Sequence, residues 1–402
     1  MSEITNCHID PSFTECIKEV QSGISKEDKF YINVEPSVYE VNDYIVHVSQ
    51  SDGQLRYDAG NGNYFKRIDG RVFEAELNNQ KFRFKTPRCD YSHIQPNSHF
   101  TCIDVLQEKI ALGDSEGLIN VFDSNFNLNL QLTGHYSDIT SVKFFPSQKV
   151  LLSSSSDMQV KIWSLDDGSN PRTLAEHRAA VTCTGIVDRG RNILTGSEDG
   201  TIKLWECGSG EVIYTFFRKE NKRDAVNDIL LLCTEAASFD THDLEFGTAG
   251  KTFLAAHHSG VITYHDIFSK EQLLQIPSEF MNPCITLSAS NTQLSDISPF
   301  YLYAGYENGT LAQWDLRKPE RSVQAMHLNK GTPINNIYFD KESLYVSSNV
   351  DTTAEIEIDL DTGRLRDPTF LVSNDCEVSQ FKSSGDDGAI FAVGKQGFWA
   401  VY

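Results

Sequence analysis

Two sets of residues combine a histidine, an aspartate and a tryptophan with the same spacing. They are His135, Asp157 and Trp163, and His177, Asp199 and Trp205, and in each set the histidine precedes the tryptophan by 28 residues. A serine lies between histidine and aspartate, and a serine, histidine and aspartate together can form a hydrolytic triad. A catalytic set is not expected to recur at constant spacing. The repetition therefore favours a structural role.

The densest group of metal-ligand residue types is His257, His258, His265 and Asp266. His257 and His258 fall at an expected hairpin turn and His265 inside the next strand, so the group is not expected to converge on one ion. The glycine-rich stretch 58–62 is not followed by the helix that a phosphate loop requires. No nucleophile elbow or zinc-protease motif occurs. The sequence predicts no catalytic residue, metal or cofactor, and hence no enzyme.

The residues of the two sets belong to a longer repeat of strands. VLLSSSSDMQVKIW ends at Trp163 and NILTGSEDGTIKLW at Trp205, and each contains two apolar runs around a tight turn, which is the signal of a β-hairpin. Five weaker copies end at Phe122, His265, Trp314, Glu357 and Tyr402. The turns recur at steps of 41, 42, 60, 49, 43 and 45 residues, and most steps match the length of a WD40 repeat.

Each copy has one further apolar strand before it or after it, and most have both. Four strands in each of seven units predict an all-β, seven-bladed β-propeller. The step of 60 residues requires an insertion, which we place in a polar loop at residues 232–248. The last unit ends after its third strand, so the strand that closes the ring is expected upstream, within residues 88–99.

The segment before the repeats is predicted to form a small, mixed, mostly β domain. A short helix is expected over residues 11–21, two strands with a turn at Glu35–Pro36, and further short strands over 59–86. The predicted domains are residues 1–87 and residues 88–402.

The charge of the chain restricts its partners. With 56 acidic and 35 basic residues, the net charge is −21, which disfavours nucleic acid and anionic membranes and favours a basic protein partner.

No secretory signal or membrane-spanning run is evident. The nine cysteines lack ligand spacing and indicate free thiols in a reducing compartment, so we expect the protein in the cytoplasm and nucleus. We also expect it to be a monomer.

Acidic residues gather in the turns expected on one face of the propeller. Turns between the second and third strands lie on one face, and the connections between successive blades are expected to open on the same face. Together they place six acidic residues at one rim: Glu116, Asp138, Glu198, Glu307, Asp375 and Glu377. Glu176, Asp224 and Asp351 are expected near them, with Arg178 and Lys330 as basic exceptions. A ring of carboxylates on a rigid rim could attract and dock a basic partner.

Several strings outside the generic repeat resemble one family. They are DSNFNLN, TFLVSND-x-EVSQF, WECGSGEVIYTF, YENGTLAQWDLR, SDMQVKIWSLDDGSNPRTL and FYINV. In these strings the chain resembles the fungal proteasomal ATPase-associated WD40 proteins, which are assembly chaperones of the 26S proteasome regulatory particle. In WD40 proteins generally, the histidine, serine, aspartate and tryptophan hydrogen-bond across one blade.

The resemblance implies a non-catalytic chaperone that holds the basic C-terminal domain of an AAA-type ATPase subunit of the proteasome base. In that family an acidic patch on the propeller makes the contact, and the matching positions are Glu198, Glu307, Asp375 and Glu377, with Cys376 interrupting the acidic run. Two alternatives remain. One is a generic WD40 adaptor, such as a substrate receptor of a ubiquitin ligase. The other is a propeller enzyme, for which the strands around the axis offer little beyond Asp138.

Overall fold

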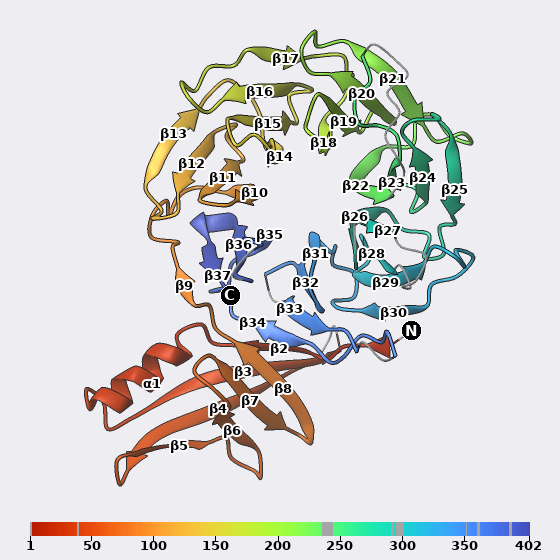
Figure 1. Ribbon diagram of the computed structural model, residues 1–402. Helices are drawn as coiled ribbons and strands as arrows, with labels where there is room; N and C mark the ends of the chain where they lie inside the picture. Colours follow the sequence, from red (N-terminus) through yellow and green to blue (C-terminus); the bar gives the residue numbers. More distant parts are fainter. Residues whose placement is uncertain are drawn as a thin grey trace.

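The computed structural model describes residues 2–37, 40–234, 244–290, 293–294, 301–350, 352–359, 362–385 and 388–402. Within these residues the strands form eight sheets, and seven of them are arranged around a central space, one for each predicted repeat (Figure 1). We call these seven sheets blades 1 to 7. Asp351 and the centre of the predicted insertion, residues 235–243, lie outside the described residues.

Blades 1 to 3 each contain four antiparallel strands in chain order. Blade 1 consists of β10 (Phe100–Leu106), β11 (Lys109–Asp114), β12 (Ile119–Asp123) and β13 (Leu128–Leu132). Blade 2 consists of β14 (Ile139–Phe144), β15 (Val150–Ser155), β16 (Val160–Ser164) and β17 (Arg172–Leu174). Blade 3 consists of β18 (Val181–Val187), β19 (Asn192–Ser197), β20 (Thr201–Glu206) and β21 (Val212–Phe217).

Blades 4 to 6 repeat this order. Blade 4 consists of β22 (Val226–Thr234), β23 (Lys251–His257), β24 (Ile262–Asp266) and β25 (Gln272–Ile276), with β27 (Gln293–Leu294) added beside β22. Blade 5 consists of β26 (Cys284–Ala289), β28 (Tyr301–Tyr306), β29 (Thr310–Asp315) and β30 (Gln324–His327). Blade 6 consists of β31 (Asn336–Asp340), β32 (Ser343–Ser348), β33 (Thr352–Glu357) and β34 (Thr369–Leu371).

Blade 7 joins the two ends of the ring. Its strands β35 (Val378–Ser383), β36 (Ile390–Gly394) and β37 (Trp399–Val401) are completed by β9 (Cys89–Asp90), which pairs antiparallel with β37. The strand β9 lies within the range 88–99 where the closing strand was expected. Tyr402 Oη donates a 2.6 Å hydrogen bond to the carbonyl of Val372, and this bond fixes the end of the chain beside blade 6.

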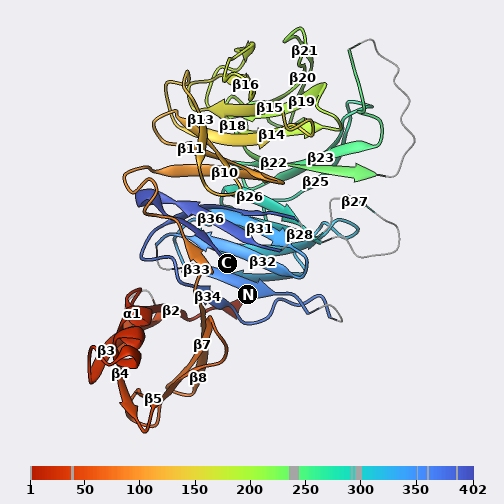
Figure 2. The same ribbon diagram turned by 60° about the vertical axis from the view of Figure 1, so that its left-hand side comes forward.

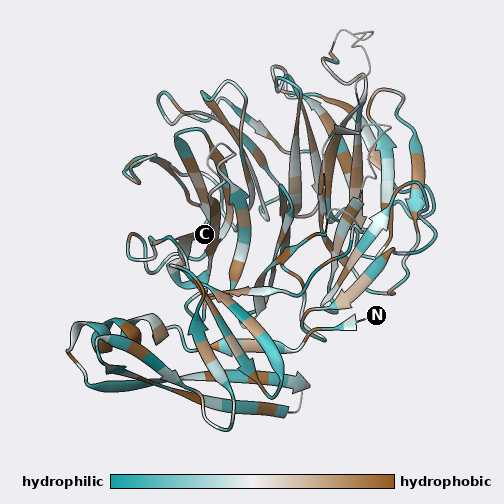
Figure 3. Ribbon diagram, turned by 60° about the horizontal axis from the view of Figure 1, so that its bottom comes forward, coloured by the Kyte–Doolittle hydropathy of each residue, from teal (hydrophilic) through white to brown (hydrophobic). Residues whose placement is uncertain are grey.

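Apolar residues fill the space between the blades. Hydrophobic residues lie mainly along the strands, and hydrophilic residues lie mainly on the turns and connections (Figure 3). In β16, for example, Val160, Ile162 and Trp163 are all buried, because both faces of an inner strand pack against neighbouring blades. Such burial is the main stabilising contribution in a fold of this kind.

The N-terminal part forms its own sheet and helix. The sheet contains β2 (Asn6–Ile9), β3 (Glu27–Ser37), β4 (Glu40–Ser51) and β5 (Gln54–Asp58), and α1 (Phe13–Ser22) packs against β3 and β4. The aromatic rings of Phe13, Phe30, Phe65 and Phe73 meet at its centre, mostly edge to face.

The turn predicted at Glu35–Pro36 is wrong. Both residues lie inside β3, at an irregularity in its pairing with β4 between Val34 and Ser37. Proline cannot donate a hydrogen bond to the strand ladder, and a bulge is a place in a strand that tolerates it.

The N-terminal part shares sheets with the propeller. Strands β6 (Tyr64–Arg67), β7 (Val72–Leu77) and β8 (Gln80–Lys85) extend the sheet of blade 6, because β8 pairs in parallel with β34. In addition, β1 (Ser2–Glu3) pairs in parallel with β30 of blade 5. Figure 2 shows the N-terminal part projecting below β33 and β34. The predicted boundary at residue 87 falls between β8 and β9, and hydrogen-bonded sheets connect the residues on its two sides.

Candidate protein-binding face

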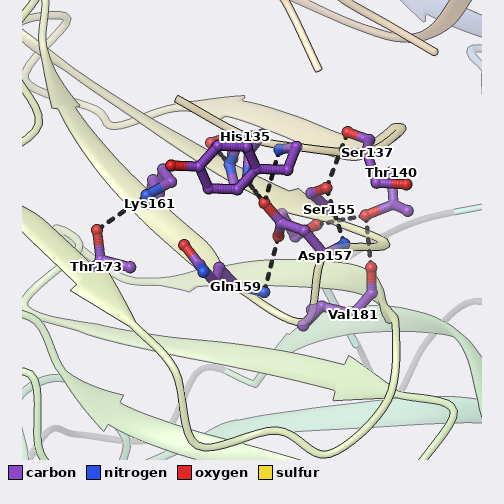
Figure 4. Close-up of polar contacts among 12 residues, drawn as sticks. His135, Ser137, Thr140, Ser155, Asp157, Gln159, Lys161, Thr173 and Val181 are labelled. Atoms are coloured by element: carbon purple, nitrogen blue, oxygen red, sulfur yellow. Dashed lines mark hydrogen bonds and ion pairs between the residues drawn. The ribbon is translucent and has the colours of Figure 1, made fainter. Parts of the chain in front are cut away.

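The histidine and aspartate of the first set meet at the edge of blade 2. His135 Nδ1 lies 2.9 Å from Asp157 Oδ2, and its Nε2 lies 2.8 Å from Ser153 Oγ. Figure 4 shows His135 and Asp157 beside the hairpin of blade 2. Trp163 Nε1 donates to the same Ser153 hydroxyl at 2.8 Å. The four side chains thus connect the entry to the blade with its second and third strands.

Blade 3 repeats this arrangement with a threonine. His177 lies 3.0 Å from Asp199 and 2.7 Å from Thr195 Oγ1, which also accepts a 2.8 Å hydrogen bond from Trp205. The hydroxyl group expected from a serine therefore comes from Thr195 in this blade.

A serine, a histidine and an aspartate do lie in the order of a hydrolytic triad in blade 2, but the group cannot act on a substrate. Ser153 is fully buried, and its oxygen already accepts the indole hydrogen of Trp163. Burial lowers the pKa of His135, outweighing the opposite effect of Asp157, so the ring is neutral at pH 7. Burial tends to raise the pKa of Asp157, but its hydrogen bonds with His135 and two backbone amides outweigh this and lower it.

The histidines of blade 4 share a hydroxyl group and do not surround an ion. His257 Nε2 and His265 Nε2 each lie 2.9 Å from Thr263 Oγ1, while His258 is exposed on the turn. Burial lowers the pKa of His265 to about 3. Within the described residues, no group of three or more histidine, cysteine, aspartate or glutamate side chains is placed to hold a metal ion.

One face of the ring is built from two alternating kinds of segment. These are the turns between the second and third strands of each blade and the connections between successive blades, and we call this surface the turn face. In blade 1, a Cβ atom at Gly117 would lie 2.8 Å from the carbonyl oxygen of His135 in the next connection. In blade 2, the Ser156 amide donates to the Asp138 carbonyl at 3.0 Å, in that same connection. Each connection therefore bridges two turns.

Four of the six predicted rim residues are exposed on the turn face. They are Glu116, Asp138, Glu198 and Glu307, and they belong to blades 1, 2, 3 and 5. Their backbones are fixed: the amides of Glu198 and Glu307, for instance, each donate a 3.0 Å hydrogen bond to the start of their own blade, at Ala180 and Pro283. No ion pair involves these four carboxylates among the described residues.

The other two rim residues have partners within the chain. Glu377 accepts a hydrogen bond from Asn335 Nδ2 at 3.0 Å and lies 2.7 Å from Lys395 Nζ. Asp375 lies 2.6 Å from His8 Nε2, which comes from the N-terminal sheet. The acidic patch that the resemblance implied is therefore partly occupied in blade 7.

Asp224 differs more strongly from its expected place on the rim. It is buried, and it binds Arg218 Nη1 at 2.6 Å and accepts a 3.0 Å hydrogen bond from the Ser259 amide. Burial alone would raise the pKa of Asp224, but these partners lower it. Asp224 is therefore part of the internal structure of blade 4.

Exposed apolar side chains on the turn face were not predicted. Tyr136 is 85% exposed, Met281 88% and Met158 45%, and all three lie on turns or connections of this face. Tyr136 lies in the same connection as Asp138, and Met158 lies on the turn between β15 and β16 of blade 2. The sequence offers a weak signal for them, because turns usually contain polar residues and glycine.

The strands around the axis were expected to offer few polar residues beyond Asp138. Asp138 itself lies just before β14, on the rim and not in the central channel, and other charged side chains lie on the axial strands. Lys382 Nζ lies 2.8 Å from Asp104 Oδ1, whose second oxygen accepts a 2.7 Å hydrogen bond from the Phe144 amide. Asp228 accepts in the same way from the Leu287 amide at 2.8 Å. These side chains connect blade 7 with blade 1, blade 1 with blade 2, and blade 4 with blade 5. Their hydrogen bonds satisfy the buried charged groups, so the burial requires no catalytic explanation.

A ring of four-stranded sheets with tetrads in its blades defines the WD40 β-propeller. The family model described as "WD domain, G-beta repeat" matches residues 126–164 and 168–206. The crystal structure of RRP9 WD40 repeats is similar with a TM-score of 0.62 and 16% identity, covering 76% of this chain and 94% of that one. The structure of U3-55K gives 0.61 and 15%, covering 76% and 95%.

Comparison with known proteins shows to which family of WD40 propellers the chain belongs. The chain is 46% identical over 419 residues to the 26S proteasome regulatory subunit RPN14 of Saccharomyces cerevisiae, covering 99% of this chain and 98% of that protein. It therefore belongs to the family of this regulatory subunit. The eukaryotic translation initiation factor 3 subunit I of Drosophila erecta is 26% identical over 228 residues, covering 56% of this chain and 65% of that protein. No helix among the described residues is long and apolar enough to cross a membrane.

Proposed function

We propose that this protein is a non-catalytic assembly chaperone for the base of the 26S proteasome regulatory particle. It binds the basic C-terminal domain of an AAA-type ATPase subunit through the turn face. The observation that carries this proposal is the set of four exposed carboxylates on the turn face, which also exposes the apolar side chains of Tyr136 and Met158. The name and identity of the yeast relative support association with the proteasome.

The two kinds of side chain have separate roles. Glu116, Asp138, Glu198 and Glu307 attract a basic domain and set its orientation, because charged rims mainly control association rate and specificity. Tyr136 and Met158 supply apolar contact area, since aromatic residues and methionine are enriched at the centres of protein interfaces. The rigid ring fixes the spacing between these groups.

Charge reversal tests the proposed interface. In one variant, Glu116, Asp138, Glu198 and Glu307 are replaced by lysine, and binding of each purified base ATPase C-terminal domain is measured by calorimetry. We expect the affinity for one domain to fall by about 100-fold or more, because several rim charges act together. The matched control replaces four exposed acidic residues on the opposite face with lysine: Glu108, Asp166, Glu211 and Glu271.

The control has the same net charge as the test variant, so general electrostatic attraction changes equally in both. An equal loss of affinity in both variants would contradict a contact through the turn face. If no ATPase domain binds the wild-type protein, and a ubiquitin-ligase scaffold does, the adaptor hypothesis replaces this proposal.

We also propose that the protein acts as a monomer in the cytoplasm and nucleus, without nucleic acid, membrane or cofactor. The basis is the net charge of −21 and the free cysteines. Light scattering of the purified protein and imaging of a tagged chain test these two statements.

A further inference from the structure

A crevice of about 720 Å³ lies where the N-terminal part meets the propeller. One side of α1 forms its first wall, and the turn between β6 and β7 forms the second. The segment 86–90, which leads from β8 into β9, and residues next to β34 complete it. Figure 1 shows α1 beside the segment that rises to β9. The crevice is separate from the turn-face residues assigned to the ATPase contact.

The crevice is basic, although the chain as a whole is strongly acidic. Lys18, Arg67, Arg71 and Arg88 line it, against Glu15 and Asp90. Asp90 is already bound, because its two oxygens accept hydrogen bonds from the Asn374 side chain at 2.7 Å and the Ser92 amide at 2.9 Å. None of the four basic residues forms an ion pair with any residue that the structure describes.

Two arginines are held at the crevice by the β6–β7 turn. Arg67 donates from Nε to the Asp69 carbonyl at 2.9 Å and from Nη2 to the Gly70 carbonyl at 2.6 Å, and its guanidinium lies 5.7 Å from the Phe73 ring centre. Arg71 Nη1 is buried and has no hydrogen-bond partner in the described part of the chain. An unsatisfied buried donor is unfavourable, so an acceptor that reaches this group would be stabilising.

We infer that this crevice binds an acidic peptide segment of a partner protein. Guanidinium groups match carboxylates with paired hydrogen bonds, which lysine cannot form. The first wall runs from Pro11, just before α1, to Gln21 within it. Its helical part, from Thr14 to Gln21, is roughly 10 Å long at about 1.5 Å per residue, which is the length of about three extended residues at about 3.3 Å each. A free phosphate would fill only one end of such a crevice.

The partner of the crevice must differ in charge from the partner of the turn face. A basic ATPase domain would be repelled here, whereas an acidic segment would be repelled by the turn face. The inference therefore does not rest on the proposed function, and either can fail alone.

Binding of fluorescein-labelled hexaglutamate to the full chain tests the inference. Fluorescence anisotropy at about 50 mM salt keeps screening weak. We expect Arg71→Gln to weaken binding by about tenfold, since a paired arginine contact is lost. A second variant, Lys18→Gln with Arg88→Gln, changes two exposed side chains and should weaken binding without affecting folding. The matched control is Arg56→Gln, an exposed arginine of β5 outside the crevice.

Each result decides the question. Weaker binding in both crevice variants, with wild-type affinity in Arg56→Gln, supports the inference. Equal affinity in all four proteins, or no binding of the peptide to wild type, overturns it. Full displacement of the peptide by inorganic phosphate also overturns it, because the site would then hold a free anion and not a peptide.

Discussion

Lys395 Nζ lies 2.7 Å from Glu377 Oε2 on the turn face, and Asn335 holds the other carboxylate oxygen. Glu377 is therefore neutralised by its own blade, unlike Glu307 in blade 5, which is exposed. The exposed rim carboxylates without an ion-pair partner in the described residues therefore lie on blades 1, 2, 3 and 5, whereas Asp375 and Glu377 of blade 7 have partners. Such a distribution would give the proposed basic partner a preferred orientation on the ring.

Release of Glu377 should strengthen the contact with a basic partner. In Lys395→Gln the carboxylate loses its ion pair and the turn face gains a negative charge, so we expect the affinity for the ATPase domain to rise by about two- to fivefold. Calorimetry measures the change. Lys149→Gln removes an exposed lysine from the opposite face and serves as the control. An unchanged or lower affinity in Lys395→Gln would show that Glu377 lies outside the contact.

The hydroxyl of Ser153 should be essential to the stability of blade 2. In Ser153→Ala, Trp163 Nε1 and His135 Nε2 lose their partner in a buried place. We expect the free energy of unfolding to fall by about 2–4 kcal/mol, as two buried polar groups become unsatisfied. Urea denaturation measures it. Thr195→Ser, which keeps the equivalent hydroxyl in blade 3, should cost about 1 kcal/mol. Similar stability losses in the two variants would argue against this role.

Removal of residues 398–402 should open the ring. These residues include β37, which pairs with both β36 and β9, and the buried side chains of Trp399 and Tyr402. An open sheet edge favours aggregation, so we expect the truncated chain to lose its cooperative melting transition. Tyr402→Phe, which only removes the bond to Val372, should cost about 1 kcal/mol. A native melting curve for the truncated chain would contradict closure by β37.

Stability should decrease below neutral pH because of His265. Its pKa is lowered by burial to about 3 in the folded protein, against about 6.5 in an unfolded chain. Between these values the unfolded chain binds a proton that the folded chain does not, so the free energy of unfolding falls as the pH decreases. At pH 5 this loss is about 2 kcal/mol for one histidine.

Urea denaturation at pH 7 and pH 5 checks this dependence. His265→Phe removes the titrating ring and keeps an aromatic group against Phe253, so the difference between the two pH values should shrink by about 2 kcal/mol. His258→Gln changes an exposed histidine of the same blade and should retain the wild-type difference. A full pH dependence in His265→Phe would assign the effect to other groups.

The sequence predicts the blades well because their signals are local. A hairpin turn such as the one at Gly200 requires a positive φ, here 84°, and a Cβ atom there would lie 2.7 Å from the carbonyl oxygen of Lys222. Glycine therefore marks the turn in the sequence. The spacing between successive turns then identifies blade 4, even though His265 stands where blades 2 and 3 have a tryptophan.

The features that the sequence does not predict depend on distant partners. The parallel pairing of β8 with β34 and of β1 with β30 has no local signature. Charge patterns likewise cannot show that Lys395 reaches Glu377, or that Arg218 draws Asp224 into blade 4. Which acidic residues remain free on the rim is decided by these tertiary contacts, and so the candidate site was only partly predictable.

The pairing of β9 with β37 also determines when the ring can close during synthesis of the chain. Ser92 and Trp399 hydrogen-bond next to this pair of strands although 307 residues separate them. At about 5–20 residues per second, a ribosome needs roughly 15 to 60 s to make the intervening segment. During this interval β9 has no partner, and its neighbouring blades have an uncovered edge. A protein proposed to protect other subunits during assembly thus passes through its own unprotected period, which ends only when β37 has left the ribosome.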